Sequence, residues 1–330
     1  MFSNVTRNQH FVSQAEQRLN ASNPGSTSKK FRIYSFRITD RENHKIELES
    51  ERGHLISSTM SMLDLFSFDV PQGTSVRRNL EDQFKTYEDN VVALTKSLLD
   101  KLSNRANNIG DELVNLFAAK LLNFIRNPFC IEKVLNSFPD FAAYSPTDPD
   151  LLETYKTIAS GRKPHQDHVC RELGVSHGTY IKWLKLLFMV LTPLKRGEST
   201  LFENMVKGLI ENRSTHNAAF VWVYDTAYCL LSDRGFCQPV ESGPTMTGWS
   251  FNLCSTAHID YVFADVGTLM RGKTAPEYLE YLLEVRKRRP PSIVYSVLNN
   301  DLAALALYNR HVIQWSRERV YCAVKSDIIL

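Results

Sequence analysis

The chain has 330 residues, enough to bury the core of one large domain or of two domains of ordinary size. Its content of 43% hydrophobic and 23% charged residues is typical of a folded soluble protein and argues against a disordered chain. The formal net charge of +3 is too small to demand a nucleic-acid partner, so any such contact has to come from local clusters of basic residues.

Six cysteines are scattered without the Cys-x-x-Cys spacing of a metal site, which favours buried thiols in a reducing compartment. No basic region followed by an apolar core opens the chain, so we expect no secretory signal. The most apolar stretch, residues 184–194, contains Lys185 and Pro193 and is shorter than the roughly 20 residues of a membrane-spanning helix. These features predict a cytoplasmic protein without a membrane partner, and they leave the oligomeric state open.

The opening segment, residues 7–14, carries an imidazole and two carboxamides within six positions. His10 is the only side chain there with an unperturbed pKa near neutrality, so it can exchange a proton at working pH. Gln9 and Gln14 offer donors and acceptors that could orient the ring or hold a substrate. The alternative is a capped, half-buried segment in which His10 only satisfies a backbone carbonyl.

Two strands are predicted next. Residues 31–38 roughly alternate between apolar and polar, and residues 45–49 follow a polar turn, so a β-hairpin is the simplest account. From 79 to 102, apolar residues recur at steps of three and four and predict one amphipathic helix. A second helix contains the stripe from Leu113 to Phe124 and should end near Asn127, because Pro128 cannot continue it.

Residues 166–183 read like a helix-turn-helix. Cys170 is the small residue that close packing of the first helix requires, Gly174 marks the turn, and Ser176 can cap the second helix. Such corners also occur as plain packing units. If the corner lies on nucleic acid, its outward and neighbouring residues are the expected contacts: Arg162, Lys163, His177, Thr179, Lys182 and Lys185.

Short apolar runs at 221–224 and 228–231 predict buried strands, and helices are expected around 278–288 and 302–315. The predicted fold is α+β with helix dominant: an N-terminal β-hairpin, central helices with the helix-turn-helix-like corner, and C-terminal mixed strands and helices. We expect three parts, namely 1–150, a helix-turn-helix-like insert at 151–215, and 216–330, which completes one polar site. A basic run, Arg286 to Arg289, is either a solvated helix end or a phosphate contact.

Asn8-Gln9-His10-Phe11-Val12, followed by Gln14, resembles the Asn-x-His-Tyr-Val-Pro-Gln opening of a bacterial family known as domain of unknown function forty-two thirty-eight. Phe11 replaces its Tyr and Ser13 its Pro. Four further stretches resemble family motifs in the family's order: Leu80-Glu81 with Tyr87-Glu88, residues 124–128, Leu231-Ser232-Asp233, and residues 298–310. Gly235 stands where the family has a second proline. The resemblance implies a context in phage defence, which some members have, and no particular reaction.

Two carboxylates stand out within these stretches. Glu88 lies at the edge of its helix's apolar stripe, where partial desolvation raises a carboxyl pKa toward use in acid–base catalysis. Asp233 ends an apolar run beside a glycine turn, a common position for a catalytic group. The alternatives are a solvated ion pair for Glu88 and a turn-capping role for Asp233.

Arg126 either binds phosphate or merely complements the negative end of its helix. Asn299 either joins the site or belongs to the N-cap of the following helix. We expect His10, Glu88 and Asp233 to be catalytic, and Gln9, Gln14, Arg126 and Asn299 to bind substrate. A divalent metal ion is left open, and no metal ligand is assigned.

The sequence therefore predicts a toxin-like or phage-defence effector that acts on nucleic acid, with nuclease-type hydrolysis of phosphodiesters. One alternative is a non-enzymatic protein that binds DNA or a protein partner through its helix-turn-helix-like corner. Another is a hydrolase or transferase acting on a nucleotide.

Overall fold

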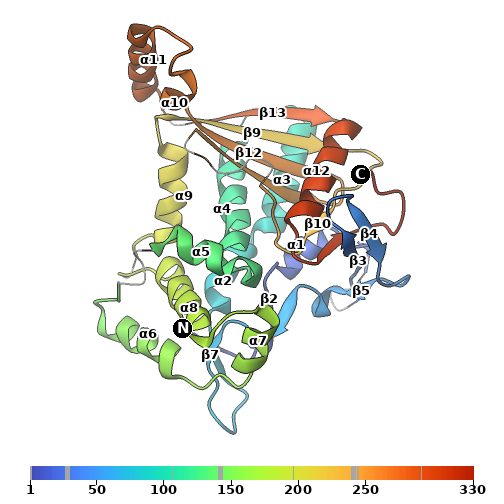
Figure 1. The fold of residues 1–330 in the computed structure, drawn as a ribbon, viewed down its shortest axis with the longest axis vertical. Helices are drawn as coiled ribbons and strands as arrows, with labels where there is room; N and C mark the ends of the chain where they lie inside the picture. Colours follow the sequence, from blue (N-terminus) through green and yellow to red (C-terminus); the bar gives the residue numbers. More distant parts are fainter. Residues whose placement is uncertain are drawn as a thin grey trace.

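The structure, a computed structural model, has the α+β fold that the sequence predicts (Figure 1). It describes residues 2–26, 30–106, 108–139, 144–195, 197–238, 243, 245–290 and 292–330. No helix within these residues is both long and apolar enough to span a bilayer.

The predicted β-hairpin is confirmed. Strands β3 (Arg32–Asp40) and β4 (Lys45–Leu48) pair antiparallel, with Phe36 opposite Leu48. Short β5 (His54–Leu55) also pairs with β3, and the C-terminal β14 (Arg319–Cys322) joins its other edge and carries β10 (Leu231–Ser232). The hairpin of residues 32–48 and the C-terminal strand thus share one sheet. The strand expected over 228–231 is reduced to β10.

Further short strands enclose the opening segment. The strand β2 (Asn8–His10) pairs with β6 (Ser61–Leu63), and α1 (Gln14–Arg18) follows directly. A three-stranded sheet has the order β1-β8-β7. Its strands and the neighbouring 3-10 turn are β1 (Ser3–Asn4), β7 (Ser67–Asp69), β8 (Arg77–Asn79) and η1 (Ile56–Ser58).

The prediction of a single helix over 79–102 is wrong, because the chain forms two helices there, α2 (Glu81–Glu88) and α3 (Val91–Ser103). Asp89 and Asn90 lie between them, and both residue types favour caps over helix interiors. The next helix, α4 (Gly110–Arg126), ends as predicted, since Asn127 is extended before Pro128. The turn η2 (Pro128–Cys130) and α5 (Ile131–Ser137) follow.

The helix-turn-helix geometry is confirmed. After α6 (Pro149–Ser160), helix α7 (Gln166–Leu173) ends at Gly174, whose φ of 68° is left-handed. Ser176 caps α8 (His177–Leu191) by accepting the amide of Thr179. Helix α9 (Leu201–Glu211) closes this region. Buried residues of α6, α8 and α9 belong to the same core as α4, so 151–215 is packed into the molecule rather than inserted as a separate unit.

A four-stranded sheet with the order β11-β12-β9-β13 lies between α4 and α12 (Leu302–Trp315). Phe117 of α4 packs on Tyr261, with ring centroids 4.9 Å apart. Tyr308 of α12 stacks at 3.9 Å on His258, which faces the opposite side of the sheet. The sequence predicted only part of this sheet, which comprises β9 (Thr215–Val223), β11 (Met246–Cys254), β12 (Ala257–Asp265) and β13 (Ile293–Asn299). Helices α10 (Val266–Met270) and α11 (Pro276–Arg288) project from one end of the molecule (Figure 1).

Two glycines with left-handed backbone provide a matched test of packing. A Cβ at Gly174 would meet nothing within 4 Å, so Gly174→Ala should cost only the left-handed strain, about 1–2 kcal/mol. At Gly235, with φ of 75°, a Cβ would lie 2.7–2.9 Å from the Asn123 side chain. Gly235→Ala should therefore lose about 1–3 kcal/mol more in urea unfolding. Equal losses would contradict the close contact with Asn123.

Candidate functional site

His10 lies half-buried at the end of β2, and both of its ring nitrogens are engaged. Nδ1 donates to the Thr59 carbonyl at 3.0 Å, and the Gln14 amide nitrogen lies 3.0 Å from Nε2. Because a carbonyl can only accept, Nδ1 carries the proton and Nε2 presents its lone pair to Gln14. Burial, together with the nearby charges of Arg126 and Arg18, lowers the pKa of His10 to about 4, although the hydrogen bond to Thr59 opposes the fall. The imidazole is therefore an unprotonated base at neutral pH.

Helix α1 places the groups around this imidazole. Ser13 caps the helix by accepting the amide of Glu16 at 3.1 Å. One turn later, Arg18 donates to the side-chain oxygen Oε1 of Gln14 at 3.2 Å, so the Gln14 side chain links the imidazole to a half-exposed guanidinium. Gln14 thus stands between His10 and the Arg18 cation.

A buried ion pair ties α1 to α4. The Lys120 ammonium lies 2.6 Å from the Glu16 carboxylate, with side chains only 1% and 2% exposed. Asn123, one turn further along α4, donates to both carboxylate oxygens at 3.0 and 3.1 Å. These contacts fix the position of α1 and therefore of Gln14.

Arg126, one turn beyond Asn123, carries the second buried charge. Its guanidinium pairs with Glu88 at the end of α2 and donates to the side-chain oxygen Oδ1 of Asn123 at 3.2 Å. Its charge centre lies 5.3 Å from the Phe84 ring centroid, a cation–π contact. Nε is buried without a partner among the described residues, whereas the Glu88 side chain is 25% exposed. Glu88 is thus the partner of Arg126 that solvent can reach.

The pKa of Glu81, at the start of α2, is shifted in the opposite direction from the pKa of His10. Burial, with a smaller effect of the Glu88 charge, raises its pKa to about 8, although the Arg126 charge opposes the rise. Its Oε1 atom is buried without a hydrogen-bond partner in the described part of the chain. Glu81 is therefore protonated at neutral pH. We give the name polar cluster to these groups, which are linked by hydrogen bonds, by two ion pairs and by the Arg126 charge that acts on both His10 and Glu81. The cluster comprises His10, Gln14, Glu16, Arg18, Glu81, Glu88, Lys120, Asn123 and Arg126.

Four of the seven residues expected in the polar site lie in this cluster: His10, Gln14, Glu88 and Arg126. Gln9 does not, and its expected role in substrate binding is corrected. Its side chain is fully buried, accepts the Phe66 amide and donates to the Ser67 hydroxyl at 3.0 Å. Successive residues of a strand point to opposite faces, so Gln9 faces the core while His10 faces α1.

The expected catalytic role of Asp233 is likewise corrected. Its buried carboxylate accepts three backbone N–H groups, those of Arg317, Glu318 and Arg319, at 2.7–3.0 Å. Burial raises its pKa while these three donors oppose the rise. The carboxylate therefore holds the start of β14. In the same loop, Gly235 approaches the polar cluster so closely that an added Cβ would lie 2.7–2.9 Å from the Asn123 side chain.

Asn299 lies at the exposed end of the edge strand β13, and no hydrogen bond in the described chain joins it to the polar cluster. The predicted cap is present beside it: Asp301 accepts the Ala304 amide at 3.0 Å and begins α12. Asn300 adopts a left-handed φ of 56° and bonds with Asp225. Asn299 thus belongs to a helix entry.

Five cluster residues were not predicted as site residues: Glu16, Arg18, Glu81, Lys120 and Asn123. Lys120 offered a signal, because it falls on the apolar stripe of Leu113, Phe117 and Phe124 at helical spacing. A lysine on a core-facing stripe requires a buried partner. The described residues hold no group of three His, Cys, Asp or Glu side chains suited to a metal ion.

The residues expected to contact nucleic acid differ in their exposure and in the contacts that their side chains already make. Lys182 is exposed on the first turns of α8, and exposed His177 lies 3.0 Å from Asp167. Thr179 bonds with the cap hydroxyl of Ser176 at 2.8 Å. The Lys185 ammonium lies 4.4 Å from the Tyr155 ring centroid. The outer face of the corner is thus formed mainly by the start of α8.

The side chains of Arg162 and Lys163 are hydrogen-bonded to the backbone of the protein. Arg162 donates to the Val70 carbonyl at 3.2 Å, and Lys163 donates to the Gly161 carbonyl at 2.9 Å. Burial lowers the pKa of Lys163. Both side chains thus bind backbone carbonyls in or beside the segment that leads into α7, so they are less available to contact a ligand.

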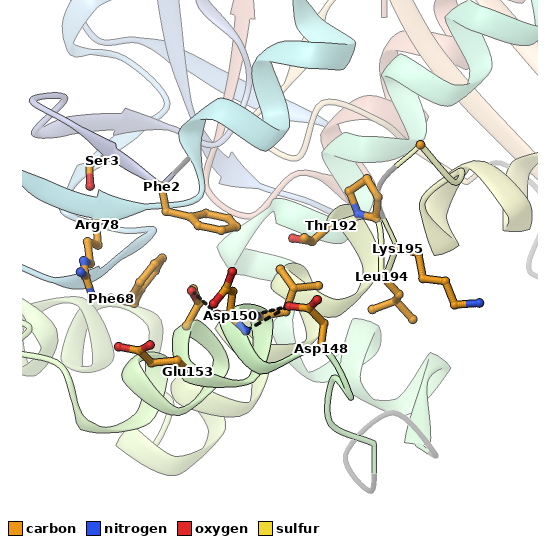
Figure 2. A pocket seen from close by; sticks show the side chains of 14 residues that line it. Phe2, Ser3, Phe68, Arg78, Asp148, Asp150, Glu153, Thr192, Leu194 and Lys195 are labelled. Atoms are coloured by element: carbon orange, nitrogen blue, oxygen red, sulfur yellow. Dashed lines mark hydrogen bonds between the residues drawn. The ribbon is translucent and has the colours of Figure 1, made fainter.

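A cavity of about 700 Å³ lies elsewhere (Figure 2). Phe2 and Phe68 form one wall, while Asp150, Glu153 and Thr192 come from α6 and the end of α8. Asp148 is occupied in capping α6 through the amides of Asp150 and Leu151, both at 3.0 Å. None of the lining residues belongs to the polar cluster.

No protein-family model, curated protein or solved structure matches this chain. The resemblance of the opening segment to a bacterial family stays a prediction.

The opposite pKa shifts of His10 and Glu81 predict a pH dependence of stability. The His10 pKa falls from 6.5 to about 4, so its contribution is complete above pH 6.5 and is lost as the pH falls through about 4. The Glu81 pKa rises from 4.5 to about 8, so its contribution is complete below pH 4.5 and is lost as the pH rises through about 8.

Urea unfolding from pH 4 to 9 checks both signs. His10→Gln should flatten the acid decline by about 2 kcal/mol, allowing for partial exposure of the ring. Glu81→Gln should become more stable relative to the parent as the pH rises from 4.5 to 8. A constant difference across this range for either variant would refute the corresponding shift.

Proposed function

We propose that this protein is an acid–base hydrolase of phosphate esters in nucleic acid, acting as a toxin-like or phage-defence effector. One observation carries the proposal: His10 is unprotonated and Glu81 is protonated at neutral pH, and the same Arg126 charge acts on both. Two ionisable groups whose environments drive their pKa values apart are the usual signature of an acid and base pair. The defence context comes only from the resemblance of the opening segment.

In the proposed reaction, water attacks phosphorus, and His10 Nε2 accepts the proton that the water loses. The bond to the leaving oxygen breaks, and Glu81 supplies the proton that this oxygen takes up. Gln14 has to release Nε2 first, which its half-exposed position permits. Arg18 and Arg126 offset the charge that develops on the phosphate.

Glu88 controls access to Arg126 in this scheme. It is the partly exposed partner of a buried guanidinium, so a phosphate oxygen could replace its carboxylate in the same fork. The phosphate brings negative charge to the place of the Glu88 carboxylate, and a nearby negative charge raises the pKa of Glu81. Glu81 would therefore stay protonated, as a general acid must be, while the substrate is bound.

The nucleic-acid part of the proposal is supported by the helix-turn-helix geometry. The left-handed Gly174 and the Ser176 cap turn the start of α8 outward, and Lys182 is exposed there. The first turns of a second helix are those that reach base edges and phosphates in such units.

The helix-turn-helix geometry also favours the second candidate function, a non-enzymatic protein that binds DNA or a protein partner through this corner. In that case, both ring nitrogens of His10 would serve only the hydrogen bonds that they now make. The alternative predicts binding without hydrolysis and no effect of His10→Ala beyond stability.

Hydrolysis of labelled DNA, RNA and a bis-aryl phosphate tests the proposal. The rate constant kcat/KM should rise with pH through about 4 and fall through about 8, following His10 and Glu81. His10→Ala should lose about 10²- to 10⁴-fold in rate. Glu81→Gln should remove the alkaline limb along with most of the activity.

His311→Ala is the matched control, because His311 is another half-buried histidine with a pKa lowered by burial, on α12 outside the polar cluster. It should keep the parent rate. The same pair can be compared for growth inhibition on expression in bacteria. Equal activity of the His10 and His311 variants would exclude His10 as the base.

Salt dependence of binding tests the corner. On duplex DNA, each phosphate contact adds about 0.9 to the slope of log affinity against log salt. Lys182→Glu should therefore flatten the slope by about 1, whereas Lys96→Glu, an exposed lysine of α3, should leave it unchanged. Equal slopes for the two variants would remove the corner from the interface.

A further inference from the structure

A small pocket of about 170 Å³ lies where the end of α11 meets the start of β9, at the base of the projecting helix in Figure 1. Its lining includes three arginines and a histidine, Arg213, His216, Arg286 and Arg289, and no described carboxylate. The sequence brings Arg286 and Arg289 together in the basic run. Only the fold adds Arg213 and His216 from the other side.

Two of these guanidiniums are held in place by backbone carbonyls. Arg286 donates through Nη2 to the Thr215 carbonyl at 2.5 Å, and Arg213 donates to the Lys287 carbonyl. Each bond crosses between β9 or its entry and α11, so together they hold the arginines around one space. Arg286 Nε is buried and has no partner among the described residues. One donor at the pocket is therefore unused.

The charges around this pocket are not balanced from within it. Lys287, on the same turn, pairs with Glu284 at 2.6 Å, so that carboxylate is already engaged. Like charges held close together repel, and a buried donor without a partner costs free energy. A bound anion would relieve both costs. The planar guanidinium fork suits the paired oxygens of a tetrahedral oxyanion.

We propose that this pocket binds the phosphate group of a phosphate monoester. Its volume lies below the roughly 300 Å³ at which pockets for drug-sized ligands begin, so it suits one phosphate group rather than a whole nucleotide. A monoester dianion matches several guanidiniums better than a singly charged diester does. The phosphate can come from a small molecule or from the phosphorylated end of a nucleic-acid strand. The site is separate from the polar cluster and does not depend on its chemistry.

Titration calorimetry with inorganic phosphate, against sodium chloride of equal ionic strength, tests the site. Arg289→Glu should weaken phosphate binding by roughly 10- to 100-fold, the effect of losing one charge-assisted contact. Arg288→Glu is the matched control, because Arg288 is exposed on the adjacent position and does not line the pocket. It should bind like the parent chain. Equal losses in the two variants, or no phosphate heat beyond that of chloride, would overturn the proposal.

A milder variant guards against loss of the fold. Arg289→Gln should also weaken phosphate binding, and the melting temperatures of all variants without phosphate should agree with the parent. If Arg289→Gln is folded and binds phosphate as the parent does, the site is refuted. Two oligonucleotides then separate the sources: tighter binding of a 5′-phosphorylated strand than of its 5′-hydroxyl counterpart assigns a strand end, and equal binding assigns a small phosphate.

Discussion

The buried ion pair between Glu16 and Lys120 is the contact on which the site depends. Both charges are almost entirely removed from water, so each needs the other, and removing one partner of such a pair typically costs about 3–5 kcal/mol. The pair joins a helix of five residues, too short to be stable alone, to the long helix α4. Gln14 and Arg18 reach His10 because this contact positions α1.

Helix α4 organises the surrounding polar groups by its periodicity. Lys120, Asn123 and Arg126 are three residues apart, so they follow one face of the helix. Each meets a different segment: Glu16 of α1, the approach of Gly235, and Glu88 of α2. Sites carried on a rigid helix hold their geometry better than sites on loops. Around this helix, the pKa values of His10 and Glu81 shift in opposite directions, because burial penalises the charged form of each, which is the cation of His10 and the anion of Glu81.

Features that depend on neighbours along the chain could be predicted from the sequence. Pro128 ends α4, Gly174 and Ser176 turn the chain between α7 and α8, and Asp301 begins α12. Each signal acts within about one helical turn, through a missing donor, a left-handed residue or a cap. The split at Asp89 was missed, because the apolar stripe continues through it.

The sequence by itself determined the α+β class, and it identified His10, Glu88 and Arg126 as candidates for chemistry. Only the tertiary structure decided which of them meet. The Gln9 side chain accepts the backbone amide of Phe66, and Asp233 accepts backbone amides more than eighty residues away. No local sequence pattern can reveal such contacts. Burial and partner identity are properties of packing, and they decide whether a polar group is spent on the fold or left for a ligand.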